Sequence, residues 1–165
     1  MRLRAWLAGF RWLHEKARRG PLPPEEVEAY REARDDLAAM LVAAQRLTLN
    51  PNQAAREALR VVRILPLELE LGTGPARGET LDISTGGFSS VLKRALQPDE
   101  MIGFTLHLGN GPLRGRARVA SVLQQETSIR VSFRLEGASP AAVELLATEV
   151  MDAALEQFAN LVEQV

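Results

Sequence analysis

The chain has 165 residues, of which 46% are hydrophobic and 25% charged, and this composition is ordinary for a globular protein that can bury its own core. It has no cysteine, which excludes a disulfide framework and a thiolate metal site and favours a reducing compartment, so we expect a cytoplasmic protein. The net charge of −1 lacks the positive excess on which binding to nucleic acid polymers depends. No apolar run is long enough to span a bilayer, and basic residues interrupt the apolar stretch that a secretory signal would need.

Charge is unevenly distributed over the first third of the chain. Residues 1–20 contain six Lys or Arg and one acid, whereas residues 21–50 contain six acids and three Arg. Such an asymmetry is typical of a separate functional piece. We therefore expect residues 1–50 to form a helical region of their own.

Residues 2–19 are predicted to form an amphipathic basic helix, because apolar residues recur at intervals of three and four. Three roles fit this apolar stripe: contact with an anionic membrane surface, insertion into a groove of a partner, or packing on its own protein or on a second copy. The stripe consists of Leu3, Trp6, Leu7, Phe10 and Leu13.

A second helix is expected from Pro24, a residue that suits the first turn of a helix, to about Leu47. Its apolar positions approximate a heptad seam that Arg34 interrupts. So short a seam favours pairing with another helix, of the same chain or of a second one. The apolar positions are Val27, Tyr30, Leu37, Leu41 and Ala44.

Residues 51–63 are expected to be an arginine-containing linker. Asn50 and Pro51 are typical of a helix start, and a helix continuing from them would place Arg56 and Arg60 on one face, four residues apart. Two guanidinium groups on one side can grip the same phosphate, because each presents a planar fork of donors. The alternative is a solvated, charged helix face.

From Leu65 onward the hydrophobic period changes to the alternation of strands. Glycine-rich turns are expected at 72–75 and 109–111. Six short strands with no helix-length connection between them favour an antiparallel barrel or sandwich over a parallel sheet. The expected strands are 65–71, 78–84, 88–92, 101–108, 113–123 and 127–133.

A long helix is expected to follow the strands, with Ser139 as its N-cap and Pro140 in its first turn. Its apolar stripe continues over about seven turns to the end of the chain. The first half could cover a face of the barrel, and the second half could meet a neighbour. The fold class predicted from these elements is α+β.

Residues that could carry other chemistry are few. Arg114, Arg116 and Arg118 alternate onto one strand face, which we interpret as a solvated outer face because the β region lacks the aromatic residues that stack on nucleic acid bases. His14 and His107 have no partner nearby in sequence, and no nucleophile, phosphate-loop or metal-ligand spacing occurs. We therefore expect no catalytic residues, no cofactor and no metal site, and hence no enzyme.

The segment Asp82-Ile83-Ser84-Thr85-Gly86-Gly87 lies where a strand must turn. Asp82 offers a carboxylate acceptor, Ser84 offers a hydroxyl, and the two glycines allow the backbone to adopt positive φ. This polar corner suits the flat, polar edge of a nucleobase. It would need positive charge from elsewhere to hold a phosphate.

Arg-x-x-x-Arg followed by Asp-x-Ser-x-x-Gly, with strands between and after, resembles the PilZ domain family, receptors for the second messenger cyclic di-GMP. The likeness covers about residues 56–155 and is densest from Thr80 to Phe88. It implies a six-stranded antiparallel PilZ-type barrel with a long C-terminal helix, here residues 64–165. The arginines would hold the phosphates and guanines, and the Asp/Ser/Gly segment would hold a guanine edge. The ligand-binding residues implied by the resemblance are Arg56, Arg60, Arg63, Asp82, Ser84, Gly86 and Gly87.

Two points of the resemblance stay open from the residues alone. The second arginine of the clamp could be Arg60 or Arg63, because the family's second arginine usually stands directly against the first strand. The resemblance implies a bacterial receptor that couples cyclic di-GMP binding to a change in helix or partner contacts; without a working arginine pair the chain would instead be an interaction module that does not bind the nucleotide. In both cases we expect a protein partner or a homo-oligomer formed through the N- and C-terminal helices.

Overall fold

The computed structural model describes residues 2–47 and 58–163. The chain divides into two compact units, one comprising residues 60–153 and the other comprising residues 1–59 together with 154–165. The first unit contains all the strands of the described residues, and the second is helical.

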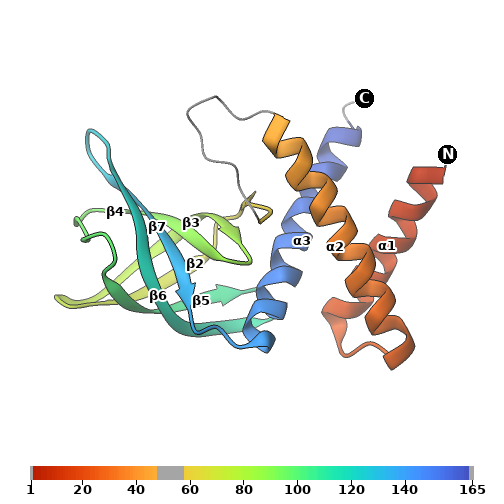
Figure 1. Ribbon diagram of the computed structural model, residues 1–165, viewed down its shortest axis with the longest axis horizontal. Coiled ribbons are helices and arrows are strands. Elements are labelled where there is room, and N and C mark those ends of the chain that lie inside the picture. The colour runs from red at the N-terminus through yellow and green to blue at the C-terminus, as the bar shows by residue number, and fades with distance from the viewer. Residues whose placement is uncertain (1, 48–57, 164–165) are drawn as a thin grey trace. The chain divides into compact units, whose positions relative to one another are not determined.

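The first unit is a closed antiparallel barrel (Figure 1). Six strands form a ring in the order β3-β2-β5-β6-β7-β4, and β4 pairs back onto β3 to close it. The two-residue strand β1 adds to the end of β3. The strands are β1 Val61–Val62, β2 Pro66–Leu71, β3 Gly74–Ser84, β4 Gly87–Leu92, β5 Met101–Leu108, β6 Gly111–Gln124 and β7 Ile129–Glu136. This confirms the six-stranded antiparallel barrel that the family resemblance implies; the alternation alone also allowed a sandwich.

The barrel is filled by the inward-facing residues of each alternating strand. Phe88 is fully buried and its ring lies 5.2 Å from that of Phe104 and 5.0 Å from that of Phe133, measured between centroids. Gly115 faces the Phe104 ring, where an added Cβ would stand 3.2 Å from two ring carbons. The core therefore depends on one small residue opposite a large one.

Several details of the strands differ from the sequence prediction. β3 begins at Gly74, inside the expected turn, because Gly74 adopts a φ of 121° and pairs with Leu71. β7 begins at Ile129 and ends at Glu136, rather than spanning 127–133. β1 was not expected at all.

The helices begin and end close to the predicted residues: α1 Arg2–Arg19, α2 Pro24–Leu47 and α3 Pro140–Glu163. Local capping explains this agreement, since the Ser139 hydroxyl accepts a hydrogen bond from the Ala142 amide at 3.1 Å. Residues 140–153 of α3 belong to the barrel unit and the remainder to the helical unit. Within the described ranges, no helix combines the length and apolarity needed to cross a membrane.

Helices α1 and α2 pack as a hairpin around one aromatic cluster. Phe10 stacks on Tyr30 with ring centroids 5.9 Å apart, and His14 Nδ1 lies 2.8 Å from the Tyr30 hydroxyl. Arg34, expected to interrupt the apolar seam, is itself buried in it, with its guanidinium 5.4 Å from the centre of the Tyr30 ring. One face of α1 is thus occupied by its own chain.

Candidate functional site

The polar corner is the hairpin between β3 and β4. The Ser84 hydroxyl accepts a hydrogen bond from the Gly86 amide at 3.2 Å, and the Gly86 carbonyl accepts one from the Leu135 amide at 2.9 Å. Gly87 packs against β7 so closely that an added Cβ would overlap the Phe133 carbonyl oxygen. The hairpin is therefore fixed to β7, and the glycine at position 87 is required by this approach of two backbones.

Asp82 lies at the centre of the corner and is only 7% exposed. A register shift in the β3–β4 ladder between Thr80 and Asp82 marks an irregularity just before it. Arg130 Nη2 donates a hydrogen bond to Asp82 Oδ2 at 2.8 Å, and Arg60 Nη1 lies 3.3 Å from Oδ1. Oδ1 is buried and accepts no hydrogen bond from the part of the chain that the structure describes. Two guanidinium groups thus meet at one carboxylate that has acceptor capacity left.

Backbone pairing explains why Arg60 reaches Asp82. Strand β1 pairs with the end of β3, placing Val62 opposite Asp82. The Thr80 hydroxyl donates a hydrogen bond to the Arg63 carbonyl at 2.6 Å, and the Arg63 amide donates one to the Leu81 carbonyl at 3.1 Å. The arginine segment is therefore tied along β3 at β1 and directly after it, and Arg60 lies just upstream of the paired residues.

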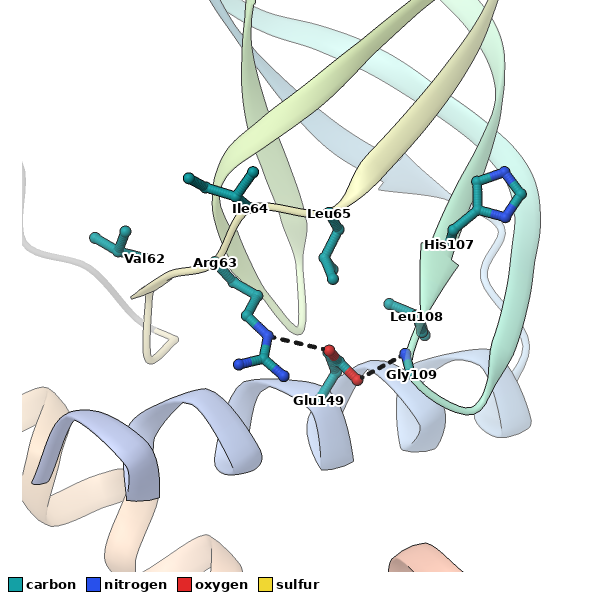
Figure 2. A pocket seen from close by; sticks show the side chains of 8 residues that line it. All are labelled: Val62, Arg63, Ile64, Leu65, His107, Leu108, Gly109 and Glu149. Carbon is teal, nitrogen blue, oxygen red and sulfur yellow. Dashed lines mark hydrogen bonds and ion pairs between the residues drawn. The ribbon is translucent and has the colours of Figure 1, made fainter. Parts of the chain in front are cut away.

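Arg63 makes different contacts from Arg60. Its Nε lies 3.2 Å from Glu149 Oε1 and its Nη2 lies 2.9 Å from Asp152 Oδ2, and both carboxylates are on α3. The other oxygen of Glu149 accepts a hydrogen bond from the Gly109 amide at 3.2 Å (Figure 2). These groups border a shallow cavity of about 520 Å³ lined by Val62, Arg63, Ile64, Leu65, His107, Leu108, Gly109 and Glu149.

The structure therefore brings five of the seven predicted site residues into one corner and directs another elsewhere. The five are Arg60, Asp82, Ser84, Gly86 and Gly87. Arg63 is engaged with α3. Arg56 lies outside the described residues.

Sequence reasoning missed two groups at this corner, Arg130 and Ser89. Ser89 is the cross-strand partner of Asp82, is fully buried, and its hydroxyl has no hydrogen-bond partner among residues 2–47 and 58–163. Alternation along β7 could have indicated that Arg130 faces outward, but only barrel closure places it beside β3. Ser89 carried no signal in the sequence.

Comparisons with known proteins agree with this architecture. A protein-family model described as the PilZ domain matches residues 54–152. Solved structures with the same fold include YcgR from Escherichia coli in complex with c-di-GMP, with a TM-score of 0.59 and 21% identity over 67% of this chain and 50% of that one. The PilZ domain of YcgR with c-di-GMP has a TM-score of 0.57 and 19% identity, covering 68% of this chain and 100% of that one.

A third similar structure is the Bacillus subtilis inhibitor of motility, MotI/DgrA, with a TM-score of 0.57 and 15% identity over 66% of this chain and 57% of that one. The chain thus spans about half the length of the longer solved structures that it matches. No curated protein matches it in sequence. At these identities, the likeness to the solved structures concerns the fold.

Proposed function

This chain belongs to the PilZ domain family, and from that premise we propose that it is a cyclic di-GMP receptor whose nucleotide site is the corner around Asp82. The observation that carries the proposal is the meeting of Arg60 and Arg130 at the buried Asp82 carboxylate, whose Oδ1 accepts no hydrogen bond from the described residues. A guanine edge supplies N–H donors that this oxygen can accept, and guanidinium groups bind phosphates bidentately. One site therefore offers both chemistries that a guanine dinucleotide requires.

Each residue has a role in this proposal. Asp82 accepts hydrogen bonds from guanine, and the Ser84 hydroxyl adds a further polar contact. Arg60, with Arg56 from the preceding segment, holds the phosphates and stacks on a base. Gly86 lets the nucleotide approach closely, because it carries no side chain, and Gly87 supports the corner through its close approach to β7.

Ligand binding would have to change the partner of Arg60. In the structure the Arg60 charge is compensated by Asp82 at 3.3 Å. A phosphate would attract Arg60 away from the carboxylate and leave Oδ1 accessible to guanine donors. The nucleotide thus favours an arrangement different from the one in the structure, which is the condition for a ligand to shift a conformational equilibrium.

The same segment offers a route for coupling to the helices. Three residues after Arg60, Arg63 is bound to Glu149 and Asp152 of α3. A movement of Arg60 toward the ligand acts on a backbone that also positions Arg63. The output in our proposal is a changed contact of the helices or of a protein partner, in a cytoplasmic, non-enzymatic receptor.

The variants Arg60→Ala and Asp82→Ala test the site by titration calorimetry with cyclic di-GMP. Each should weaken binding by at least about tenfold, because a charge-assisted contact contributes about 1.5–3 kcal/mol. Arg77→Ala is the matched control, since Arg77 is exposed on β3 and its ion pair is a long one, to Glu68 at 3.7 Å. If both site variants are folded by circular dichroism and bind with unchanged affinity, the nucleotide site must lie elsewhere.

A second candidate is a PilZ-type adaptor that does not bind the nucleotide and acts through its helices. The specific observation in its favour is that Arg60 and Arg63 both already have carboxylate partners within the barrel unit. Under this alternative the ion pairs are permanent structural contacts. The two candidates differ in whether unmodified protein takes up cyclic di-GMP at all.

A further inference from the structure

The outer face of α1 is unlike the face that packs on α2. Phe10 and His14 are 4% and 2% exposed and contact Tyr30. The exposed residues of α1 cover a wide arc on the other side. At 100° per residue, one segment of about 100° contains Arg4, Ala8, Arg11, Trp12, Glu15 and Arg19.

Much of the positive charge on this outer face is not neutralised by the residues that the structure describes. Arg4, Arg11 and Arg19 form no ion pair with any residue that the structure describes. The one acid of α1, Glu15, is bound to Arg18 at 2.9 Å. The arginine charges are therefore left for an external anion.

Trp12 is the large apolar residue of this face and is 63% exposed. Lys16 Nζ lies 5.1 Å from the centre of its ring and is also bound to Glu26 at 2.7 Å. Ala8, one helical turn earlier, is also exposed, so a short side chain leaves the indole projecting outward. An amphipathic ring among unpaired arginines is the arrangement found where a helix lies in the headgroup region of a bilayer.

Spacing and charge favour a lipid surface over other anions. Arg4, Arg11 and Arg19 are separated by about 10 Å and about 12 Å along the helix, so each would meet a different headgroup rather than converge on one ligand. The acids Glu28 and Glu32 of α2 stand two positions from Tyr30, on the side of α2 away from α1. If the basic face instead bound those acids on a second copy, two different surfaces would meet head to tail. Such a contact produces an open filament unless its rotation closes a ring.

We propose that the outer face of α1 binds the surface of membranes rich in anionic phospholipids, with Trp12 at headgroup depth and the three arginines on the phosphates. This role is independent of nucleotide binding. Each basic residue near such a surface contributes a factor of about five to partitioning. The binding should therefore weaken steeply as the salt concentration rises.

The test measures co-sedimentation of the full chain with vesicles of phosphatidylglycerol and phosphatidylcholine, and with vesicles of phosphatidylcholine alone. Arg4→Gln combined with Arg11→Gln should lower partitioning onto the anionic vesicles by about 25-fold. The matched control is Arg114→Gln combined with Arg116→Gln, which removes the same charge from two exposed positions on β6. The control should bind as the unmodified protein does.

Fluorescence gives a second readout from Trp12 itself. Anionic vesicles should shift tryptophan emission to the blue in unmodified protein, and the shift should be largely lost in Trp12→Phe. The proposal would be overturned if the unmodified protein did not bind anionic vesicles. It would also be overturned if both double variants lost vesicle binding equally. Two other results would also overturn it if vesicles are not bound. One is a dimer in sedimentation velocity that depends on Arg4 and Arg11, and the other is binding to duplex DNA that depends on the same two residues.

Discussion

Asp82 owes its surroundings to arginines from opposite ends of the barrel sequence. Arg60 precedes the first strand and Arg130 lies on the last, yet both reach the same carboxylate. A buried carboxylate costs several kcal/mol unless it is compensated by charge or hydrogen bonds. The site is thus held together by the charges that we propose to act on the nucleotide.

The two glycines of the corner should respond differently to the same substitution. In Gly87→Ala the new methyl group would collide with the Phe133 carbonyl, a backbone atom that cannot move independently of β7. We expect a loss of about 3 kcal/mol in the free energy of unfolding. In Gly86→Ala the new Cβ would lie 3.8 Å from the Ser84 hydroxyl, so the change should stay within about 0.5 kcal/mol. Urea unfolding of both variants checks this, and equal losses would contradict the assigned packing.

Glu136 provides a prediction about pH. Its hydrogen bond from Arg118 Nε at 2.9 Å lowers the pKa of the Glu136 carboxyl below its ordinary value. Because the folded-state pKa is lowered, the pair contributes stability above the unfolded-state pKa and loses it as the pH falls through the folded-state pKa. Arg118→Gln should raise the pKa of Glu136 in an NMR titration. If the titration curve of Glu136 is unchanged in Arg118→Gln, a group other than Arg118 lowers the pKa of Glu136.

At the scale of elements, the short strand β1 and helix α3 are joined through Arg63. Glu149 and Asp152 of α3 are 7% and 9% exposed as side chains, and Arg63 compensates part of their buried charge. Glu149 also accepts the amide of Gly109 in the β5–β6 hairpin, so one carboxylate connects three elements (Figure 2). The first half of α3 is therefore attached to the barrel by polar contacts as well as by burial of residues such as Leu146.

Removing this connection should destabilise the barrel unit more than removing an exposed ion pair does. Arg63→Met leaves two buried carboxylates without their guanidinium, and we expect a loss of about 3 kcal/mol. Arg77→Met, at a side chain 88% exposed, should cost less than about 1 kcal/mol. Chemical denaturation of the two variants compares the losses directly. A near-zero loss for Arg63→Met would mean that α3 does not depend on the contact.

Elements whose signals are local were predictable from the sequence. Ser139 and Pro140 mark the start of α3 through capping that involves only adjacent residues, and Pro24 does the same for α2. β1 was missed because Val61–Val62 is too short for alternation and becomes a strand only by pairing with β3. Arg34 was misjudged because burial of a guanidinium over Tyr30 depends on the packing partner, which the helix period does not reveal.

The candidate site shows the same division. The hairpin containing Asp82, Ser84 and Gly87 could be predicted because turn chemistry is local. The convergence of Arg60 and Arg130 could not, because closure of β4 onto β3 and addition of β1 depend on the whole ring. Contacts between residues far apart in sequence are set by topology rather than by local pattern.

At the scale of the whole molecule, one unit is the barrel with the proposed nucleotide site, and the other is the helical unit with the proposed membrane face. Helix α3 contributes residues to both units. A receptor built in this way would pass a signal through the segment that begins at Arg60 and through α3. The first requirement of this account is that the unmodified chain binds the nucleotide.

Isothermal titration of the unmodified full chain with cyclic di-GMP, with molecular mass followed by light scattering, tests that requirement directly. We expect saturable heat with a dissociation constant in the micromolar range or tighter. A micromolar constant corresponds to a binding free energy of about −8 kcal/mol. The mass would report in the same experiment whether binding changes assembly. If folded protein gives no saturable heat at tens of micromolar nucleotide, the proposed receptor function is contradicted. The adaptor that does not bind the nucleotide would then be the remaining candidate.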